Sequence, residues 1–189
     1  MTTVREDAGR VAVIDDDALA KSAKSGDRSA FAEIVYRFAP RVFRFLRARG
    51  LTDADAEDAT QDAFLAAYES LKNYDPSRAF AAWLFAIARN KAASMARRTR
   101  TTAPLDVAAD IAATDPAPSL NDGESGIWRL AKEKLNAREF DALYLKYADG
   151  LTVDALADSL GVSAINARQI LHRARRILAD AFGDKEAIQ

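Results

Sequence analysis

The sequence predicts an all-α protein in which two small helical domains are joined by an extended linker. Of its 189 residues 41 are alanine, 8 glycine and 5 proline, so helix formers are abundant and helix breakers are few. Apolar residues recur at helical spacing on both sides of residues 101–126. That segment contains three prolines and two glycines but no lysine or arginine, and we expect it to be the linker.

Charge is strongly segregated along the chain, although the total is nearly neutral. With 27 basic and 28 acidic residues the net charge is −1, which by itself argues against a nucleic-acid partner. Residues 21–100, however, carry 15 basic and 9 acidic side chains, whereas residues 101–126 carry 5 acidic and no basic ones. Residues 1–20 have a net charge of −3 and residues 127–189 of +1. The sequence therefore contains a basic block, an acidic linker and a mixed block.

The composition excludes several classes of function. The chain has no cysteine and one histidine, which excludes thiolate metal sites, disulfide frameworks and a cysteine nucleophile. The longest apolar run, Phe80–Ala88, is far shorter than the ~20 residues of a membrane span, and the N-terminus lacks the features of a signal peptide. We expect a cytoplasmic protein with no membrane insertion, no metal, no cofactor and no small-molecule substrate.

Four helices are expected in the first block. They span residues 18–25, 29–49, 52–72 and 78–100, with a turn at residues 73–77. Pro40 lies inside the second helix and is expected to kink it or split it. Thr52 and Asp55 have the spacing of a capping box at the start of the third helix.

The second block is expected to end in a helix-turn-helix. Helices are expected over residues 126–135, 137–147, 153–160 and 164–182, with Asn136, Thr152 and Ser163 as their capping residues. Gly161 makes the turn between the last two helices. Ile165 and Ile170 are expected to seat the last helix against the preceding one.

Three surfaces are candidates for function. An acidic ridge at residues 55–62 suits a metal ion or acid–base chemistry, but no third type of ligand accompanies it, and a solvated face is the simpler interpretation. Helix 78–100 is expected to bury Phe80, Leu84 and Ile87, with Trp83 and Phe85 elsewhere around it. Its aromatic, amide and basic side chains suit unstacked bases and phosphates, the alternative being a core tryptophan before a solubilising basic turn. The last helix exposes amides and guanidiniums, which suit base edges, the alternative being a helical hairpin with a basic face.

Three stretches, in this order, resemble the extracytoplasmic-function (ECF) sigma factors of bacterial RNA polymerase. They are DAEDATQDAF (Asp55–Phe64), FAAWLFAIARNKAASMARR (Phe80–Arg98), and GLTVDALADSLGVS (Gly150–Ser163) followed by RARRIL (Arg173–Leu178). The resemblance covers residues 18–182 and implies two domains, sigma regions two and four, with no region three between them. The expected boundaries are an acidic tail at 1–17, region two at 18–100, the linker at 101–126, region four at 127–183 and a C-terminal tail at 184–189.

The resemblance also implies a role for each candidate surface. The residues that would dock on the clamp helices of the polymerase β′ subunit are Asp55, Glu57, Asp58, Gln61, Asp62, Phe64 and Leu65. Those that would melt the minus-ten element and bind its non-template strand are Asn73, Tyr74, Asp75, Ser77, Arg78, Phe80, Trp83, Arg89, Asn90, Lys91, Arg97 and Arg98. Those that would contact the minus-thirty-five duplex are Ser163, Asn166, Arg168, Gln169, His172, Arg173, Arg175 and Arg176.

The resemblance therefore implies a promoter-specificity subunit with no catalytic residues. Its partners would be core RNA polymerase (the β′ clamp helices and the β subunit), promoter DNA and an anti-sigma factor, with the acidic linker running toward the active centre and the RNA exit path. The chain differs from the family pattern at Ile165, Ala167 and Ile170. A stand-alone helix-turn-helix regulator is the alternative, and a helical-bundle enzyme is a third hypothesis that the absence of a phosphate loop disfavours.

Overall fold

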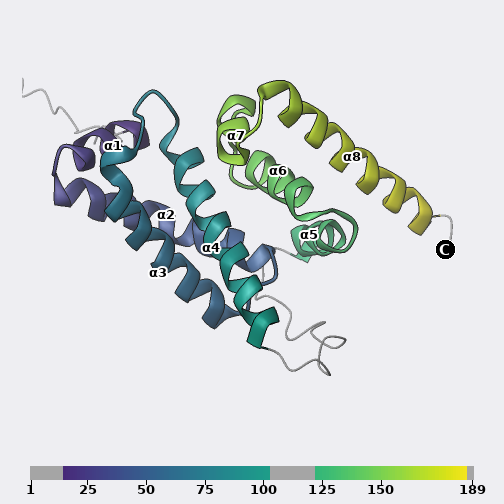
Figure 1. Ribbon diagram of the computed structural model, residues 1–189. Coiled ribbons are helices and arrows are strands. Elements are labelled where there is room, and N and C mark those ends of the chain that lie inside the picture. The colour runs from purple at the N-terminus through teal and green to yellow at the C-terminus, as the bar shows by residue number, and fades with distance from the viewer. Residues whose placement is uncertain (1–14, 103–121, 187–189) are drawn as a thin grey trace, which may run out of the picture.

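The computed structural model describes residues 15–102 and 122–186, which form helices and no strand (Figure 1). The prediction of an all-α fold with two helical units is confirmed. No helix in these two ranges is long and apolar enough to cross a membrane. The elements are α1 (Asp16–Lys24), α2 (Arg28–Ala48), α3 (Asp53–Ser70), the 3₁₀ turn η1 (Leu71–Asn73), α4 (Phe80–Thr102), α5 (Asp122–Lys134), α6 (Ala137–Tyr147), α7 (Val153–Leu160) and α8 (Ala164–Glu186).

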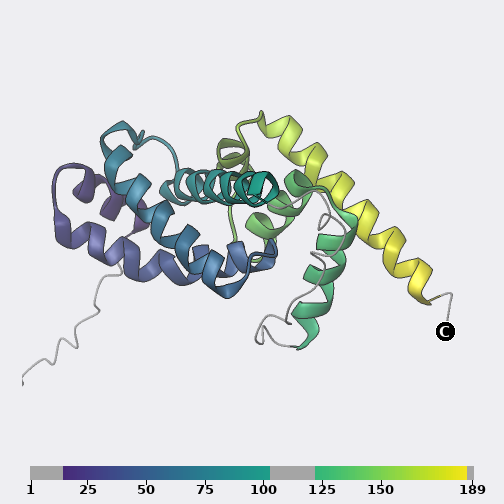
Figure 2. The same cartoon turned by 60° about the horizontal axis from the view of Figure 1, so that its bottom comes forward.

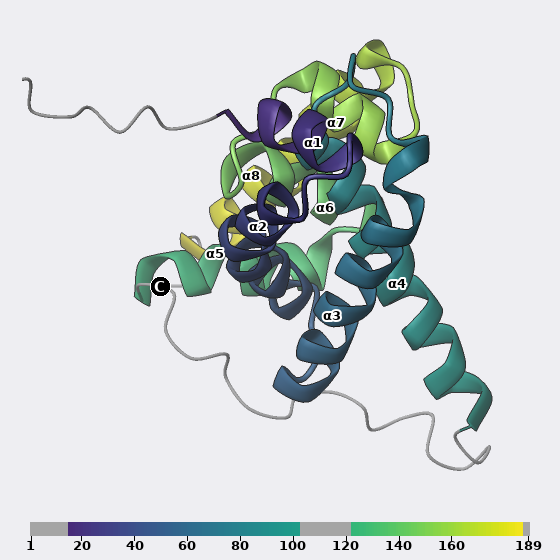
Figure 3. The same ribbon diagram turned by 90° about the vertical axis from the view of Figure 1, so that its left-hand side faces the viewer.

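Helices α1 to α4 form the first bundle around large apolar side chains. Helix α2 packs against α1 and α3, and α3 packs against α4, as Figure 3 shows from the side. Phe38 and Phe45 of α2 and Leu84 and Phe85 of α4 are fully buried in its core. The rings of Phe45 and Phe85 meet edge to face with their centroids 5.4 Å apart, a favoured geometry for aromatic pairs.

Four helices begin at the capping residues that the sequence predicts. Thr52, Thr152 and Ser163 each accept a hydrogen bond from the backbone N–H three residues further on, at 3.1, 3.2 and 3.2 Å. Asn136 and Glu139 form a complete capping box at the start of α6. Local sequence therefore determines where these helices start.

The helices differ from the alternatives that the sequence allows in three places. Helix α2 is not split, since it continues through Pro40, and its residues on either side, Phe38 and Val42, are both fully buried and hold it to the core. Helix α5 begins at Asp122, within the expected linker, whose residues 103–121 lie outside the described part. Phe85 is buried because α4 is covered on two sides, by the first bundle and by the second.

Helices α5 to α8 form the second bundle, in which α6 packs against α5, α7 and α8. Figures 1 and 2 show α8 running along its outer side. Gly161, between α7 and α8, has φ 65°, a left-handed conformation that glycine adopts without strain. Ile170 and Ala167 are buried as the seat of α8, but Ile165 is 65% exposed, so the expectation that it packs inward is wrong. It lies five residues before Ile170, on another face of the helix.

The two bundles pack against each other through α4. This helix lies in the middle of Figure 1, where it contacts α3 on one side and α7 on the other. The ring of Phe45 in α2 lies 5.4 Å from that of Tyr144 in α6. The helix that the sequence marks as a nucleic-acid surface is therefore also the interface between the bundles.

Candidate nucleic-acid interface and acidic ridge

The acidic ridge lies on the outer face of α3, opposite a row of alanines. Asp55, Glu57, Asp58, Gln61 and Asp62 are all exposed. The opposite face buries the small side chains Ala56, Ala59, Ala63 and Ala67, which lets α3 approach its neighbours closely. The described residues contain no group of three or more histidine, cysteine or acidic side chains that could bind a metal ion. The ridge is a solvated carboxylate surface in this conformation.

Two apolar residues expected on this ridge differ in their exposure. Leu65 is 57% exposed beside the carboxylates, and Tyr68, one turn further on, is 49% exposed. Phe64, in contrast, is 8% exposed and belongs to the core, so it cannot be a direct contact of a partner here. The ridge therefore ends in an exposed apolar edge made of Leu65 and Tyr68.

The segment from the end of η1 to the start of α4 presents polar side chains. Asn73, Asp75, Ser77 and Arg78 are exposed. Asp75 Oδ1 accepts hydrogen bonds from the backbone N–H of Ser77 (3.0 Å) and from its hydroxyl (2.8 Å). These bonds lower the pKa of Asp75, so the carboxylate is charged at neutral pH.

Beneath the loop lies an aromatic cluster of Tyr74, Phe80 and Trp83. The ring of Tyr74 lies 5.4 Å from that of Phe80 and 5.3 Å from that of Trp83. Tyr74 and Phe80 are 1% and 0% exposed, so neither can contact DNA directly in this conformation, contrary to the role that the resemblance implies, whereas the burial of Phe80 agrees with its helical spacing. Burial raises the pKa of Tyr74 to about 12, and its hydroxyl donates to the carbonyl of Arg78 (2.6 Å). Only Trp83 is partly exposed, as a stacking surface would have to be.

Further along α4 the expected cations differ in their accessibility. Asn90 and Arg97 are exposed, and Lys91 is partly exposed with its Nζ 3.9 Å from Asp62 Oδ2. The side chain of Arg98 lies outside the described part. Arg89 is partly buried against the second bundle, and this burial lowers the pKa of its guanidinium.

The outer face of α8 carries every residue that was expected on it. Together with the capping residue before the helix, the exposed polar residues of this face include Ser163, Asn166, Arg168, Gln169, His172, Arg173, Arg175 and Arg176. The opposite face buries Ala167, Ile170, Leu171, Ala174 and Leu178 against α6 and α7. A helix of this kind presents amides and guanidiniums to one side, as a helix in the major groove does.

Arg173 of α8 pairs with a buried carboxylate of α6. Its Nε donates to Oε1 of the buried Glu139 at 2.6 Å. The other oxygen of Glu139 accepts from the N–H of Asn136 (3.2 Å) in the capping box of α6. The sequence reveals the capping box but not this pairing, because the two residues come from separate helices.

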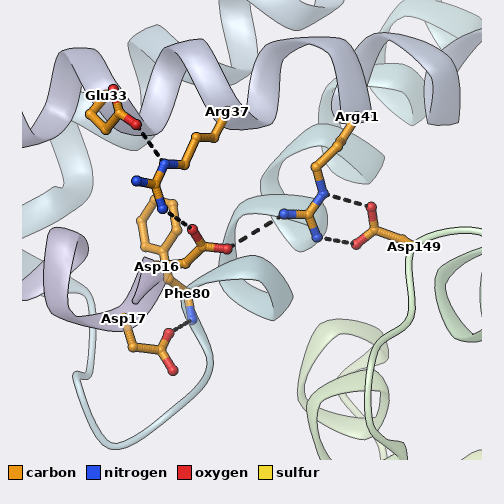
Figure 4. A network of polar contacts seen from close by, with 7 residues as sticks. All are labelled: Asp16, Asp17, Glu33, Arg37, Arg41, Phe80 and Asp149. Atoms are coloured by element: carbon orange, nitrogen blue, oxygen red, sulfur yellow. Dashed lines mark hydrogen bonds and ion pairs between the residues drawn. The ribbon is translucent and has the colours of Figure 1, made fainter. Parts of the chain in front are cut away.

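Carboxylates of the second bundle contact cations of the first. Arg78 Nη1 lies 3.3 Å from Asp158 of α7. Arg49 Nη1 donates to Asp141 of α6 at 2.9 Å. Arg41 makes a forked pair with Asp149, in the turn after α6 (Figure 4). Sequence patterns did not identify these carboxylates, since nothing local distinguishes them from solvated ones.

The two innermost carboxylates of this interface have raised pKa values. Burial raises the pKa of Asp141 to about 6, although Arg49 and Arg89 act in the opposite direction. Among the described residues, Asp141 Oδ1 is one of the few buried side-chain atoms with no hydrogen-bond partner. Burial also raises the pKa of Asp149, against the effect of Arg41. Removal from water therefore outweighs ion pairing at both sites.

Comparison with known proteins matches both bundles to described families. Residues 34–102 match the family model "Sigma-70 region 2" and residues 125–178 match "Sigma-70, region 4". The RNA polymerase sigma factor CnrH of Cupriavidus metallidurans is 30% identical, over 95% of this chain and 98% of its own. The ECF RNA polymerase sigma factor SigD of Mycobacterium bovis is 31% identical, over 89% and 85%.

Two solved structures share the fold over most of the chain. CnrH in complex with the cytosolic domain of CnrY has a TM-score of 0.68 and 27% identity, covering 89% of this chain and 97% of its own. The sigma factor RpoE in complex with the anti-sigma factor NepR, from Bartonella quintana, has a TM-score of 0.66 and 24% identity, covering 81% and 96%.

Proposed function

The chain belongs to the ECF sigma factors of bacterial RNA polymerase, which act in transcription initiation. From this premise we propose which partner each of its surfaces binds. The acidic ridge of α3 binds core polymerase at the β′ clamp helices. Its support is the row of exposed carboxylates Asp55, Asp58 and Asp62, which ends in the apolar edge of Leu65. Charge draws the surfaces together, and apolar contact adds affinity at short range.

The loop at residues 73–79 and the exposed side of α4 bind the minus-ten element. Trp83 offers a partly exposed ring for base stacking, and Asn73 and Ser77 offer hydrogen bonds. Further along α4, the residues beside the path of the DNA strand are Asn90, Lys91 and Arg97. Extruding a base costs a few kcal/mol, which stacking and phosphate contacts have to offset. The buried rings of Tyr74 and Phe80 pack against the ring of Trp83 and hold it in place.

The outer face of α8 binds the minus-thirty-five element as duplex DNA. The exposed amides of Asn166 and Gln169 suit adenine, and the guanidiniums of this face suit guanine or phosphate. This face is the single observation that carries the DNA-binding proposal, because its amide and arginine residues are exposed while Ala167, Ile170, Leu171 and Ala174 are buried on the opposite face.

Binding both promoter elements requires the two bundles to separate. Arg78 and Arg89, two of the expected minus-ten residues, face Asp158 and Asp141 of the second bundle. DNA phosphates and these carboxylates compete for the same cations. We therefore propose that core polymerase binds an open form of the chain, in which these pairs are broken.

The remaining assignments concern the rest of the chain and its partners. We propose that region two comprises α1 to α4 (residues 16–102) and region four α5 to α8 (residues 122–186), joined by an acidic linker. An anti-sigma factor is a proposed partner, supported by the likeness to RpoE bound to the anti-sigma factor NepR. The protein has no catalysis of its own, and it works in the cytoplasm, where core polymerase and DNA are found.

Reconstitution with purified core polymerase tests this function. The chain is expected to co-elute with core and to direct run-off transcription from promoters recovered by mapping transcripts after its overexpression. A chain that neither co-elutes nor directs a transcript would overturn the proposal. Specific promoter binding by the chain alone, with no requirement for core, would favour a stand-alone regulator instead.

A further inference from the structure

We propose that Asp17, on α1, is a positioning residue that fixes the start of α4 and thereby the minus-ten surface. The inference rests on the proposed function, because that function assigns DNA to this surface. Asp17 belongs to a run of three aspartates, Asp15 to Asp17, which by sequence looks like part of an acidic tail.

Helix α4 is preceded by a residue whose side chain cannot cap it. The residue before it is Ala79, whose methyl group cannot accept a hydrogen bond, although the first N–H groups of any helix lack partners within it. Asp17 supplies the missing acceptor from another helix, with Oδ1 2.7 Å from the backbone nitrogen of Phe80 (Figure 4). A carboxylate at this end of a helix also interacts favourably with the helix dipole.

Helix α1 holds the loop before α4 at a second point. Lys24 Nζ donates to the carbonyl of Tyr74 at 2.5 Å, and the Tyr74 hydroxyl in turn donates to the carbonyl of Arg78. Asp17 and Lys24 are seven residues apart, so they lie on the same face of α1, two turns from each other. One face of α1 therefore ties down the loop near its start and the helix that follows it.

Trp83 is the side chain whose position depends on this arrangement. It lies one turn after Phe80, and its ring packs 5.6 Å from that of Phe80 and 5.3 Å from that of Tyr74. Loss of the Asp17 bond frees the first turn of α4 and lets the Trp83 ring move relative to the loop. Asp17 touches no DNA in this scheme. The neighbouring Asp16 points instead toward Arg37 and Arg41.

The test compares substitutions at Asp17 in holoenzyme assembled from full-length chain and core polymerase. The probe is a duplex promoter recovered by transcript mapping, and promoter opening is measured by permanganate reactivity of unpaired thymines. We expect Asp17→Ala to reduce opening about five- to tenfold, the range that corresponds to loss of one helix cap. Asp17→Asn keeps an acceptor oxygen and is expected to stay within about twofold of wild type.

Two controls separate positioning from a general structural defect. Asp15→Ala removes a neighbouring exposed carboxylate that makes no side-chain capping bond, and should leave opening unchanged. Affinity for core and the far-ultraviolet circular dichroism of Asp17→Ala should equal those of wild type. Wild-type opening by Asp17→Ala, or loss of core binding in parallel with opening, would overturn the inference. Failure of the wild-type chain to direct any core-dependent transcript would instead contradict the proposed function on which the inference rests.

Discussion

Arg41 of α2 and Asp149 of the second bundle form a forked ion pair that joins the two domains. Arg41 Nε and Nη2 donate to the two carboxylate oxygens of Asp149 at 2.9 and 2.8 Å, and the Asp149 side chain is only 5% exposed. The third nitrogen of Arg41 lies 3.6 Å from Asp16. A single guanidinium thus connects α1, α2 and the turn after α6, as Figure 4 shows.

Breaking this pair is expected to open the chain. Asp149→Ala removes a forked, partly buried interaction and should weaken domain closure by roughly 1.5–3 kcal/mol. Because the natural chain has no cysteine, single cysteines placed on α3 and α8 permit specific labelling, and the distance between two fluorophores reports the opening. Glu33→Gln, which removes an ion pair with Arg37 inside α2, is the matched control. An unchanged distance in Asp149→Ala would show that this pair does not hold the domains together.

The raised pKa of Asp141 predicts a specific pH dependence of stability. The folded chain binds a proton at a pKa of about 6, whereas the ordinary value is 3.8. Protonation of Asp141 therefore adds ~1–3 kcal/mol to the free energy of unfolding. This contribution is complete below about pH 4 and is lost as the pH rises through about 6. Urea unfolding should show that the free energy of unfolding of wild type falls by this amount between pH 4.5 and pH 7.5, relative to that of Asp141→Asn. Asp149 is intact in both proteins, so its own raised pKa cancels. Parallel pH profiles would contradict the assignment.

Charge reversal on the acidic ridge is expected to weaken polymerase binding. Asp58→Arg places a cation among the exposed carboxylates of α3 and should reduce affinity for core at least tenfold, and more at low salt than at high salt. Asp180→Arg makes the same charge change at an exposed aspartate of α8, away from the ridge, and should retain affinity for core. Equal affinity of Asp58→Arg and wild type, measured by titration of labelled chain with core, would remove the ridge from the docking surface.

Arg173 is expected to contact a base rather than phosphate alone. Its pairing with Glu139 fixes the guanidinium in one orientation, which a forked contact to guanine requires. Arg173→Ala should weaken holoenzyme binding by ~1–3 kcal/mol and relax preference at one minus-thirty-five position. Binding is to be compared across promoters changed one base at a time in that element. A uniform loss at every variant, with a smaller salt dependence, would assign Arg173 to phosphate instead.

Much of this protein can be predicted from the sequence, for a local reason. Helix starts depend on residues a few positions apart, so Thr52, Asn136 and Ser163 identify them without knowledge of the fold. The surface of α8 also follows from spacing, since burying Ile170, Leu171 and Ala174 on one face turns His172 and Arg173 outward. The segregation of charge, hidden in the total, is likewise a property of the sequence.

Packing between distant segments determined the features that the sequence did not predict. The family resemblance placed Tyr74 and Phe80 among the DNA-binding residues, and helical spacing placed Phe85 off the core, yet all three are buried, because neighbouring helices cover them. The same packing brings Asp17 to the start of α4 and Asp149 to Arg41. The sequence by itself determined the helices, their caps and the family. The tertiary structure decided which charges meet, because such pairs depend on the contact between helices and not on the spacing within one.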